Sequence, residues 1–214
     1  MKRTYIENLK DFVNEEVLVG IWGIFYNPEI SRISFILLGF LFLISALRKA
    51  FILGFDNLRG KFWILLSLNG LFFPISELFY SKPLHLISRL YLTFTLGFMF
   101  LGLLKQGLQL KGKKLIIWLF GLIVSISLSF IFSIYLKTAI DYLFLIVLNV
   151  NFAILLANVL LYLGSDLGKR WLLGFLAFSF FFVGDPLYLL NMNYYFFFWS
   201  LIFFFMNMMS YIEE

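Results

Sequence analysis

Long apolar runs separated by short polar connections dominate the pattern of this chain. A helix needs about 20 mostly apolar residues to cross about 30 Å of hydrocarbon. Seven runs meet that requirement approximately, at residues 31–48, 61–80, 84–104, 114–136, 138–163, 171–191 and 193–212. Because the connections are short, consecutive runs are expected to be antiparallel neighbours. The pattern predicts an all-α, polytopic transmembrane bundle of about seven spans over residues 31–214.

The first thirty residues have a different pattern. Apolar residues recur there in steps of three and four, and charged residues fill the gaps. This spacing predicts an amphipathic helix over residues 1–30 that lies in the membrane interface and ends at Asn27-Pro28. Its purely apolar part, residues 17–26, is too short for an ordinary span. An eighth, short span is the alternative interpretation.

The composition excludes a soluble domain. Hydrophobic residues make up 62% of the 214 residues and charged residues 14%, whereas soluble domains average about 45–50% and about 25%. The chain has no cysteine and a single histidine, His85. Disulfides and bis-histidine haem are therefore excluded, and the sequence predicts neither a metal site nor a cofactor.

Lysine and arginine are unevenly distributed between alternate connections. The two opposite connections carry Lys82 and Lys137, whereas those after the first, third and fifth runs carry Lys49, Arg59, Lys61, Lys105, Lys111, Lys113, Lys114, Lys169 and Arg170. Positive residues favour the cytoplasmic side. This predicts a multi-pass protein of a prokaryotic plasma (inner) membrane, with its N-terminus outside and its C-terminus cytoplasmic. The expected partner is the lipid bilayer; other membrane subunits or a homo-oligomer remain open, and no nucleic acid is expected.

Four ionisable residues interrupt the apolar runs: Glu77, Arg89, Asp141 and Asp185. Such side chains are costly at membrane depth and usually face the bundle interior with a partner. All four fall in the outer half of the predicted membrane. Arg89 is the natural bidentate partner for a carboxylate.

Prolines accompany two of these carboxylates. Pro74 precedes Glu77 by three positions, and Pro186 follows Asp185 directly. Each proline frees a backbone carbonyl, which must be satisfied by neighbours or water. The six residues therefore predict a polar, outward-facing vestibule. The alternative is a structural ion pair, Asp185 or Glu77 with Arg89, that only pins the helices together.

A second polar layer lies deeper. Serines at 125, 129 and 133 recur every four residues, and Asn149 with Ala153 and Ala157 does the same on the next run. Small and polar residues at this spacing are typical of helix-packing seams. Three further asparagines, Asn69, Asn151 and Asn158, fit either a seam or a polar path from the vestibule to the cytoplasm.

Two short segments resemble known membrane hydrolases. Phe182-Val-Gly-Asp185 resembles part of the Gly-x-Gly-Asp signature of intramembrane aspartyl proteases, with Phe182 in place of the first glycine and Asp141 as a second acid. Asp185-Pro-Leu-Tyr-Leu-Leu-Asn191 is similar to a segment of lysoplasmalogenase-like proteins, with Glu77 as a substitute for their earlier acid. These segments do not assign the chain to a family. The resemblances imply carboxylates that activate water by sharing a proton.

The sequence favours a non-enzymatic membrane protein: a ligand-sensing module, a small transporter or a subunit of a membrane complex. The alternative is a lipid- or peptide-active intramembrane hydrolase that uses Asp185 with Asp141 or Glu77. The sequence shows no serine–histidine pair in a membrane context.

Overall fold

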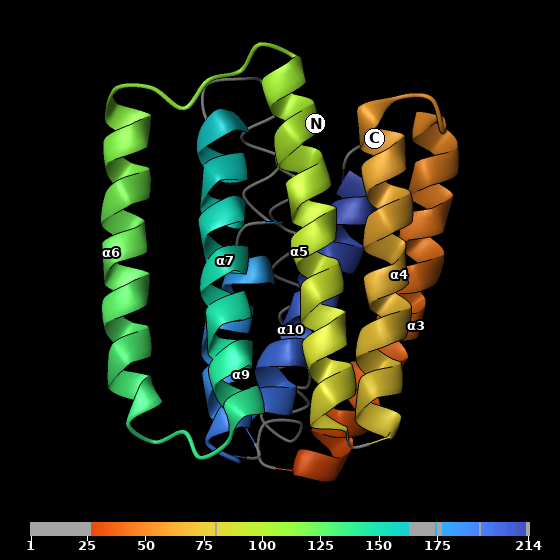
Figure 1. Cartoon of the computed structure of the whole chain (residues 1–214). Helices are drawn as coiled ribbons and strands as arrows, with labels where there is room; N and C mark the ends of the chain where they lie inside the picture. Colours follow the sequence, from red (N-terminus) through yellow and green to blue (C-terminus); the bar gives the residue numbers. More distant parts are fainter. Residues whose placement is uncertain (1–26, 80, 163–173, 175–176, 193, 213–214) are drawn as a thin grey trace, which may run out of the picture.

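A computed structural model describes residues 27–79, 81–162, 174, 177–192 and 194–212. These residues form seven helices and no strand (Figure 1), which confirms the all-α class for this part of the chain. The helices are α3 (Pro28–Leu53), α4 (Leu58–Leu78), α5 (Lys82–Lys105), α6 (Lys113–Ser133), α7 (Ala139–Tyr162), α9 (Phe181–Leu189) and α10 (Tyr195–Ile212). The predicted interfacial helix lies almost entirely outside the described residues, as does the start of the sixth run.

Four helices, α3, α5, α6 and α7, are long and apolar enough to cross a membrane. The apolar helices at the C-terminal end are shorter, at 177–189 and 195–211. Length and composition therefore indicate a membrane protein.

The start of α3 follows from local capping. The Asn27 side chain accepts hydrogen bonds from the backbone N–H groups of Glu29 and Ile30, at 3.0 and 3.2 Å. Pro28 occupies the first helical turn, where its missing N–H costs nothing. Asn27-Pro28 is thus a helix start, two residues before the predicted boundary at residue 30.

The end of α3 differs from the prediction. Placing Lys49 in a loop is wrong: the helix continues to Leu53, and Lys49 is only 1% exposed. Gly54 ends the helix with a φ of 80°, a conformation that glycine adopts without strain. Arg59 and Lys61 likewise lie in the first turn of α4. A charge does not stop a helix, because lysine and arginine have apolar stems that pack along it.

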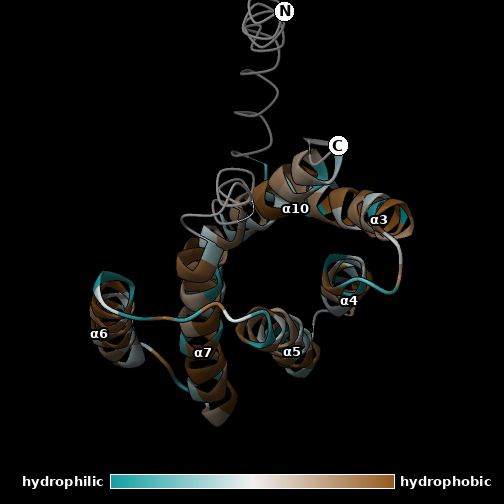
Figure 2. Ribbon diagram, turned by 90° about the horizontal axis from the view of Figure 1, so that it is seen from above, coloured by the Kyte–Doolittle hydropathy of each residue, from teal (hydrophilic) through white to brown (hydrophobic). Residues whose placement is uncertain are grey.

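Six helices form a closed ring, and α6 stands outside it (Figure 2). Around the ring, α3 contacts α4, α4 contacts α5, α5 contacts α7, α7 contacts α9, α9 contacts α10, and α10 returns to α3. Within the described residues, α6 packs mainly on α7 and contains no buried residue. The ring interior is therefore the place where polar side chains can be shielded from lipid.

Glycines bring α3 and α4 into backbone contact. A Cβ atom added to Gly60 would lie 1.9 Å from the carbonyl oxygen of Gly54, and one on Gly70 would lie 2.6 Å from that of Gly39. Pro74 packs in the same contact, because a Cβ on Gly39 would lie 2.4 Å from its ring. Small residues at such crossings allow close helix approach in a membrane.

Candidate functional site

A buried layer of charges lies at one end of the ring. Glu77 is at the end of α4, Arg89 in the first third of α5, Asp141 in the first turn of α7 and Asp185 in the middle of α9. All four are between 0% and 3% exposed. Antiparallel neighbours bring these positions to the same end, because α4 finishes where α5 and α7 begin (Figure 1).

Arg89 and Asp185 form a fully buried bidentate ion pair. Arg89 Nε donates to Asp185 Oδ2 at 2.7 Å, and Nη2 donates to Oδ1 at 2.6 Å. Trp199 Nε1 adds a third hydrogen bond to Oδ1 at 2.8 Å. Charge-assisted, forked bonds of this kind are strong and directional. The pair therefore fixes α5 to α9 and, through Trp199, to α10.

Aromatic rings surround the Arg89 guanidinium. Its central carbon lies 4.3 Å from the ring centroid of Phe73, 4.4 Å from Phe181, 4.8 Å from Trp199 and 5.7 Å from Phe144. These rings belong to α4, α9, α10 and α7 respectively. Cation–π attraction strengthens when water is excluded. Arg89 thus extends into the ring interior and contacts four other helices.

A hydrogen-bonded chain runs beside this pair. His85 Nε2 lies 3.1 Å from Glu77 Oε2, and His85 Nδ1 lies 2.9 Å from the Ser76 hydroxyl. All three residues are about 1% exposed. The sequence analysis did not predict this serine–histidine pair. It could have been predicted from the short connection between α4 and α5, which brings the last turn of α4 opposite the first turn of α5.

Two rim cations, which the sequence analysis did not single out as site residues, complete the layer. Arg32 Nε lies 3.3 Å from Glu77 Oε1, and Lys82 Nζ donates to Asp141 Oδ1 at 2.9 Å. Asp141 also caps α7, because its Oδ2 accepts the Thr138 N–H at 3.2 Å while the Thr138 hydroxyl oxygen accepts the Asp141 N–H at 3.3 Å. This is the reciprocal arrangement of a capping box.

The three carboxylates each have a different basic partner. Asp185 pairs with Arg89, Asp141 with Lys82, and Glu77 with Arg32 and His85. Two carboxylates that activate water share one proton. No such carboxylate–carboxylate contact is among the interactions of these three side chains. Pro74, one of the predicted vestibule residues, lies against Gly39 of α3, whereas Pro186 is buried beside Asp185 in α9.

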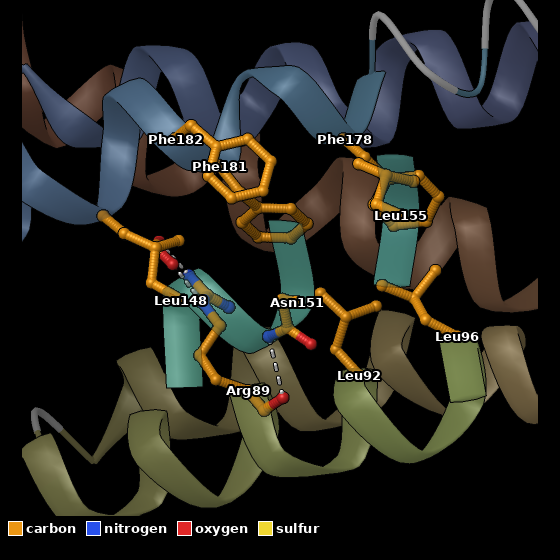
Figure 3. Close-up of a pocket in the computed structure, with 10 residues that line it drawn as sticks. Arg89, Leu92, Leu96, Leu148, Asn151, Leu155, Phe178, Phe181 and Phe182 are labelled. Carbon is orange, nitrogen blue, oxygen red and sulfur yellow. Dashed lines mark hydrogen bonds and ion pairs between the residues drawn. The ribbon is translucent and has the colours of Figure 1, made fainter. Parts of the chain in front are cut away.

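A small cavity adjoins the ion pair (Figure 3). Its volume is about 10 Å³, and its polar lining is Arg89, Asp185 and Asn151. This is room for about one water molecule. Asn151 Nδ2 donates to the Arg89 carbonyl at 3.2 Å, while Asn151 Oδ1 and Arg89 Nη1 have no hydrogen-bond partner.

A second cavity of about 10 Å³ continues along α7 and shares Leu96, Leu155 and Phe178 with the first. Asn158 lines it and repeats the same arrangement one heptad on. Its Nδ2 donates to the Leu96 carbonyl at 3.0 Å, and its Oδ1 has no partner. Asn151 and Asn158 therefore each bond across a helix contact, and each lines a small cavity.

Other buried polar atoms also have no hydrogen-bond partner. Asn69 on α4 is 2% exposed, and neither of its amide atoms is bonded. Toward the opposite end of the ring, the same holds for Lys49 Nζ and Trp63 Nε1. Buried polar groups normally find a partner in the protein or in ordered water. These atoms therefore mark positions where water or a solute is expected.

The predicted seam between α6 and α7 is present. Asn149 Oδ1 accepts from the Ser125 hydroxyl at 2.6 Å, and Asn149 Nδ2 donates to Ser129 Oγ at 2.7 Å. Ser133 is not part of it, because its hydroxyl bonds to the Phe130 carbonyl in its own helix. The Trp118 indole adds a bond to the Ala153 carbonyl at 2.8 Å.

The described residues thus define an all-α protein with apolar helices of membrane-spanning length and a buried charged layer. They contain no group of three His, Asp or Glu side chains that could hold a metal ion. No protein-family model, no curated protein and no solved structure matches the chain. Its function is therefore argued from the geometry.

Proposed function

We propose that the chain is a non-enzymatic, multi-pass protein of a prokaryotic inner membrane and acts as a small transporter. The ring interior is the path, and the charged layer is its outer end. One observation carries this proposal: buried polar atoms without a hydrogen-bond partner follow the ring interior. They are Arg89 Nη1, both amide atoms of Asn69, Asn151 Oδ1 and Asn158 Oδ1.

Lipid makes such atoms expensive. Within a bilayer every polar group must be satisfied inside the protein, and each failure costs several kcal/mol. A helix bundle that served only as a scaffold would gain stability from leucine at the three asparagine positions. Water or a passing solute supplies the missing partners instead, and the two cavities beside Asn151 and Asn158 have room for single waters.

The Arg89–Asp185 pair closes the outer end of this path. Solute entry requires the two side chains to separate, since the pair and its aromatic surroundings fill the interior at that level. Separating a buried pair is costly unless another group replaces the lost contacts. A solute with polar or charged groups provides that replacement, so the pair opens on binding and closes behind the solute.

Cysteine accessibility tests the path directly, because the chain has no cysteine of its own. Asn151→Cys and Asn158→Cys should react with a small, water-soluble methanethiosulfonate reagent. Asn149→Cys in the α6–α7 seam and Ile146→Cys, 58% exposed on α7, are the controls and should stay unreactive. Opening the pair with Arg89→Leu and Asp185→Asn should accelerate labelling at position 158.

The outcomes separate the alternatives. Labelling at 151 but not at 158 would favour a ligand-sensing vestibule that ends at the charged layer. If both positions are as inert as the controls, the ring interior is a packing seam and the transporter proposal is wrong.

A second candidate function rests on Ser76, His85 and Glu77. Hydroxyl, imidazole and carboxylate follow one another at 2.9 and 3.1 Å, which is the order of nucleophile, base and orienting acid in serine hydrolases. In the described state the Ser76 hydroxyl also bonds to the Phe73 carbonyl at 2.8 Å and is buried. Attack on a lipid or peptide ester would therefore require the outer end to open.

An alkyl fluorophosphonate probe tests this hydrolase. A working site would form a phosphonyl ester at Ser76 with loss of fluoride, and Ser76→Ala would abolish the labelling. Ser88→Ala is the matched control, because Ser88 is also buried and its hydroxyl bonds to the His85 carbonyl at 2.7 Å. Wild-type protein that remains unlabelled in lipid vesicles would remove this candidate.

A further inference from the structure

A larger groove lies at the end of the ring opposite the charged layer. It is formed where α4 begins and α5 ends, and its volume is about 430 Å³. The residues that line it are Asp56, Leu58, Lys61, Phe98, Leu101, Gly102, Lys105 and Gln106. None of the polar side chains that line the proposed path lines this groove, so the groove is a separate feature.

A glycine allows close packing beside the groove. Leu58, the first residue of α4, lies over Gly102 of α5, where an added Cβ would be 2.3 Å from Leu58 Cδ1. Because Gly102 has no side chain, Leu58 packs directly against α5. The apolar side chains that line the groove are Leu58, Phe98 and Leu101, and its polar rim consists of Asp56, Lys61, Lys105 and Gln106.

The rim carries an excess of positive charge. Lys61 and Lys105 come from facing helix ends, and both are exposed. Neither forms an ion pair in the described structure, and the single carboxylate on the rim, Asp56, is also exposed and outside any described salt bridge. Two ammonium groups therefore remain available to an anion at this position.

An apolar stripe leads from the rim toward the middle of α5. Phe94, Phe98, Leu101 and Lys105 are spaced by four, three and four residues, so they share one face of the helix. Phe94 and Leu101 are each 59% exposed. Phe98 lies about 10 Å along the helix axis from Lys105 at 1.5 Å per residue. The stripe is long enough to contact the part of an acyl chain that lies next to the head group.

We propose that this groove binds an anionic phospholipid. The phosphate lies between Lys61 and Lys105, and one acyl chain runs over Leu101 and Phe98. Basic pockets between membrane helices on the cytoplasmic side bind anionic head groups in this way. A soluble anion would use the two lysines but not the apolar stripe, and a neutral lipid would use the stripe but not the lysines. The combination specifies an amphiphile with a negative head.

Lipid binding by the purified full chain tests the proposal. In neutral detergent, dioleoyl phosphatidylglycerol should raise the midpoint of thermal unfolding, whereas dioleoyl phosphatidylcholine and glycerol phosphate should not. Lys61→Gln combined with Lys105→Gln should weaken the phosphatidylglycerol effect by roughly 10- to 30-fold in concentration, since each lysine near an anionic lipid contributes about fivefold.

The matched control is Lys111→Gln combined with Lys113→Gln. This variant removes the same two charges at the same end of the molecule, from exposed positions outside the groove, and should respond to phosphatidylglycerol as the wild type does. Leu101→Ser keeps both lysines and should weaken the lipid effect by about threefold through the lost apolar contact.

Three results would overturn the proposal. Equal losses in the two double variants would show a general charge effect. An equal effect of glycerol phosphate would show a site for soluble anions. No effect of phosphatidylglycerol on wild-type protein would show that the groove takes no lipid. None of these results depends on whether the ring interior transports a solute.

Discussion

Helix α7 carries asparagines on two faces, and their hydrogen bonding differs between the faces. Toward α6, Asn149 is saturated: its oxygen accepts from Ser125, and its nitrogen donates to Ser129 and to the Leu145 carbonyl. Toward α5, Asn151 and Asn158 each donate one bond to a backbone carbonyl and leave the oxygen unpartnered. The less buried asparagine is thus the better bonded one.

This difference distinguishes an asparagine that only holds two helices together from asparagines that we propose line a path. A residue that only holds two helices together is selected to use all its hydrogen-bonding groups, as Asn149 does. Asn151 and Asn158 each keep one buried amide oxygen that the helix contact does not use. Under the transporter proposal, the α5 face of α7 lines the path, and the α6 face holds a peripheral helix in place.

The largest expected effect is at the Arg89–Asp185 ion pair, which lies beside Asn151 in the ring interior. Arg89→Leu leaves Asp185 buried without its cation and should reduce the free energy of unfolding by about 3–5 kcal/mol. Combining it with Asp185→Asn should recover much of that loss, because neither charge is then stranded. Thermal or denaturant unfolding in detergent measures both. Additive losses in the double variant would mean that the two residues are not energetically coupled.

A smaller loss of stability is expected for a glycine substitution in the ring, and almost none for one in the peripheral helix α6. Gly70→Ala forces its Cβ to within 2.6 Å of a backbone oxygen and 2.9 Å of a backbone nitrogen, so α3 and α4 must move apart at about 1–3 kcal/mol. Gly121→Ala on α6 meets only the flexible end of Leu156, at 2.4 Å. That variant should be close to neutral, because alanine also favours the helix by about 1 kcal/mol. Comparable losses would show that α6 is packed as tightly as the ring.

Within α7, we expect Asn149→Leu to lower the free energy of unfolding by about 1 kcal/mol more than Asn158→Leu does. Asn149→Leu removes several hydrogen bonds and strands two serines, each worth about 1 kcal/mol or less. Asn158→Leu removes one bond but also one unsatisfied oxygen, so it should be nearly neutral in stability. If the ring is a path, Asn158→Leu should nevertheless block labelling of Asn151→Cys from the inner side. A larger loss of stability for Asn158→Leu would reverse our assignment of the two faces.

The smallest effect is expected at the Lys82–Asp141 ion pair. The Lys82 side chain is 35% exposed, whereas Asp141 is buried. Asp141 keeps its hydrogen bond from the Thr138 N–H when Lys82 is removed, so we expect this half-exposed pair to contribute about 1 kcal/mol or less. Lys82→Met should therefore change stability only slightly, and less at high salt than at low salt. A loss as large as that of Arg89→Leu would show that the rim pair is shielded from water.

The helices could be predicted from the sequence because apolar length is a local signal. The charged layer could also be predicted, since Glu77, Arg89, Asp141 and Asp185 interrupt runs that are otherwise apolar. The choice between Asp185 and Glu77 as the partner of Arg89 could not be predicted, because Arg89 and Asp185 are separated by 96 positions. Their pairing depends on the ring closure between α7, α9 and α10, which no local pattern specifies.

Other misses have a common cause. Hydropathy places Lys49 and Lys82 in loops, because an apolar run ends at the first cation when hydropathy is the only criterion. Ser76 and His85 were not linked, because each is unremarkable in its own helix and the contact arises only when α4 and α5 fold against each other. The Ser76–His85 contact could have been predicted from the positions of the two residues on either side of the α4–α5 turn, but not from their residue types.

The separation between Arg89 and Asp185 also sets a problem of timing during synthesis. The chain emerges at about 5–20 residues per second, so the 96 intervening positions require roughly 5–20 s. Through that interval α5, an apolar helix of membrane-spanning length, holds a guanidinium whose final counterion has not been made. An arginine at the centre of a membrane helix costs about 2.5–3.5 kcal/mol or more. Glu77, at the end of α4, is made before Arg89 and lies in the same charged layer. We expect it to serve as a temporary counterion that lets the nascent α4–α5 hairpin insert before Asp185 has been made.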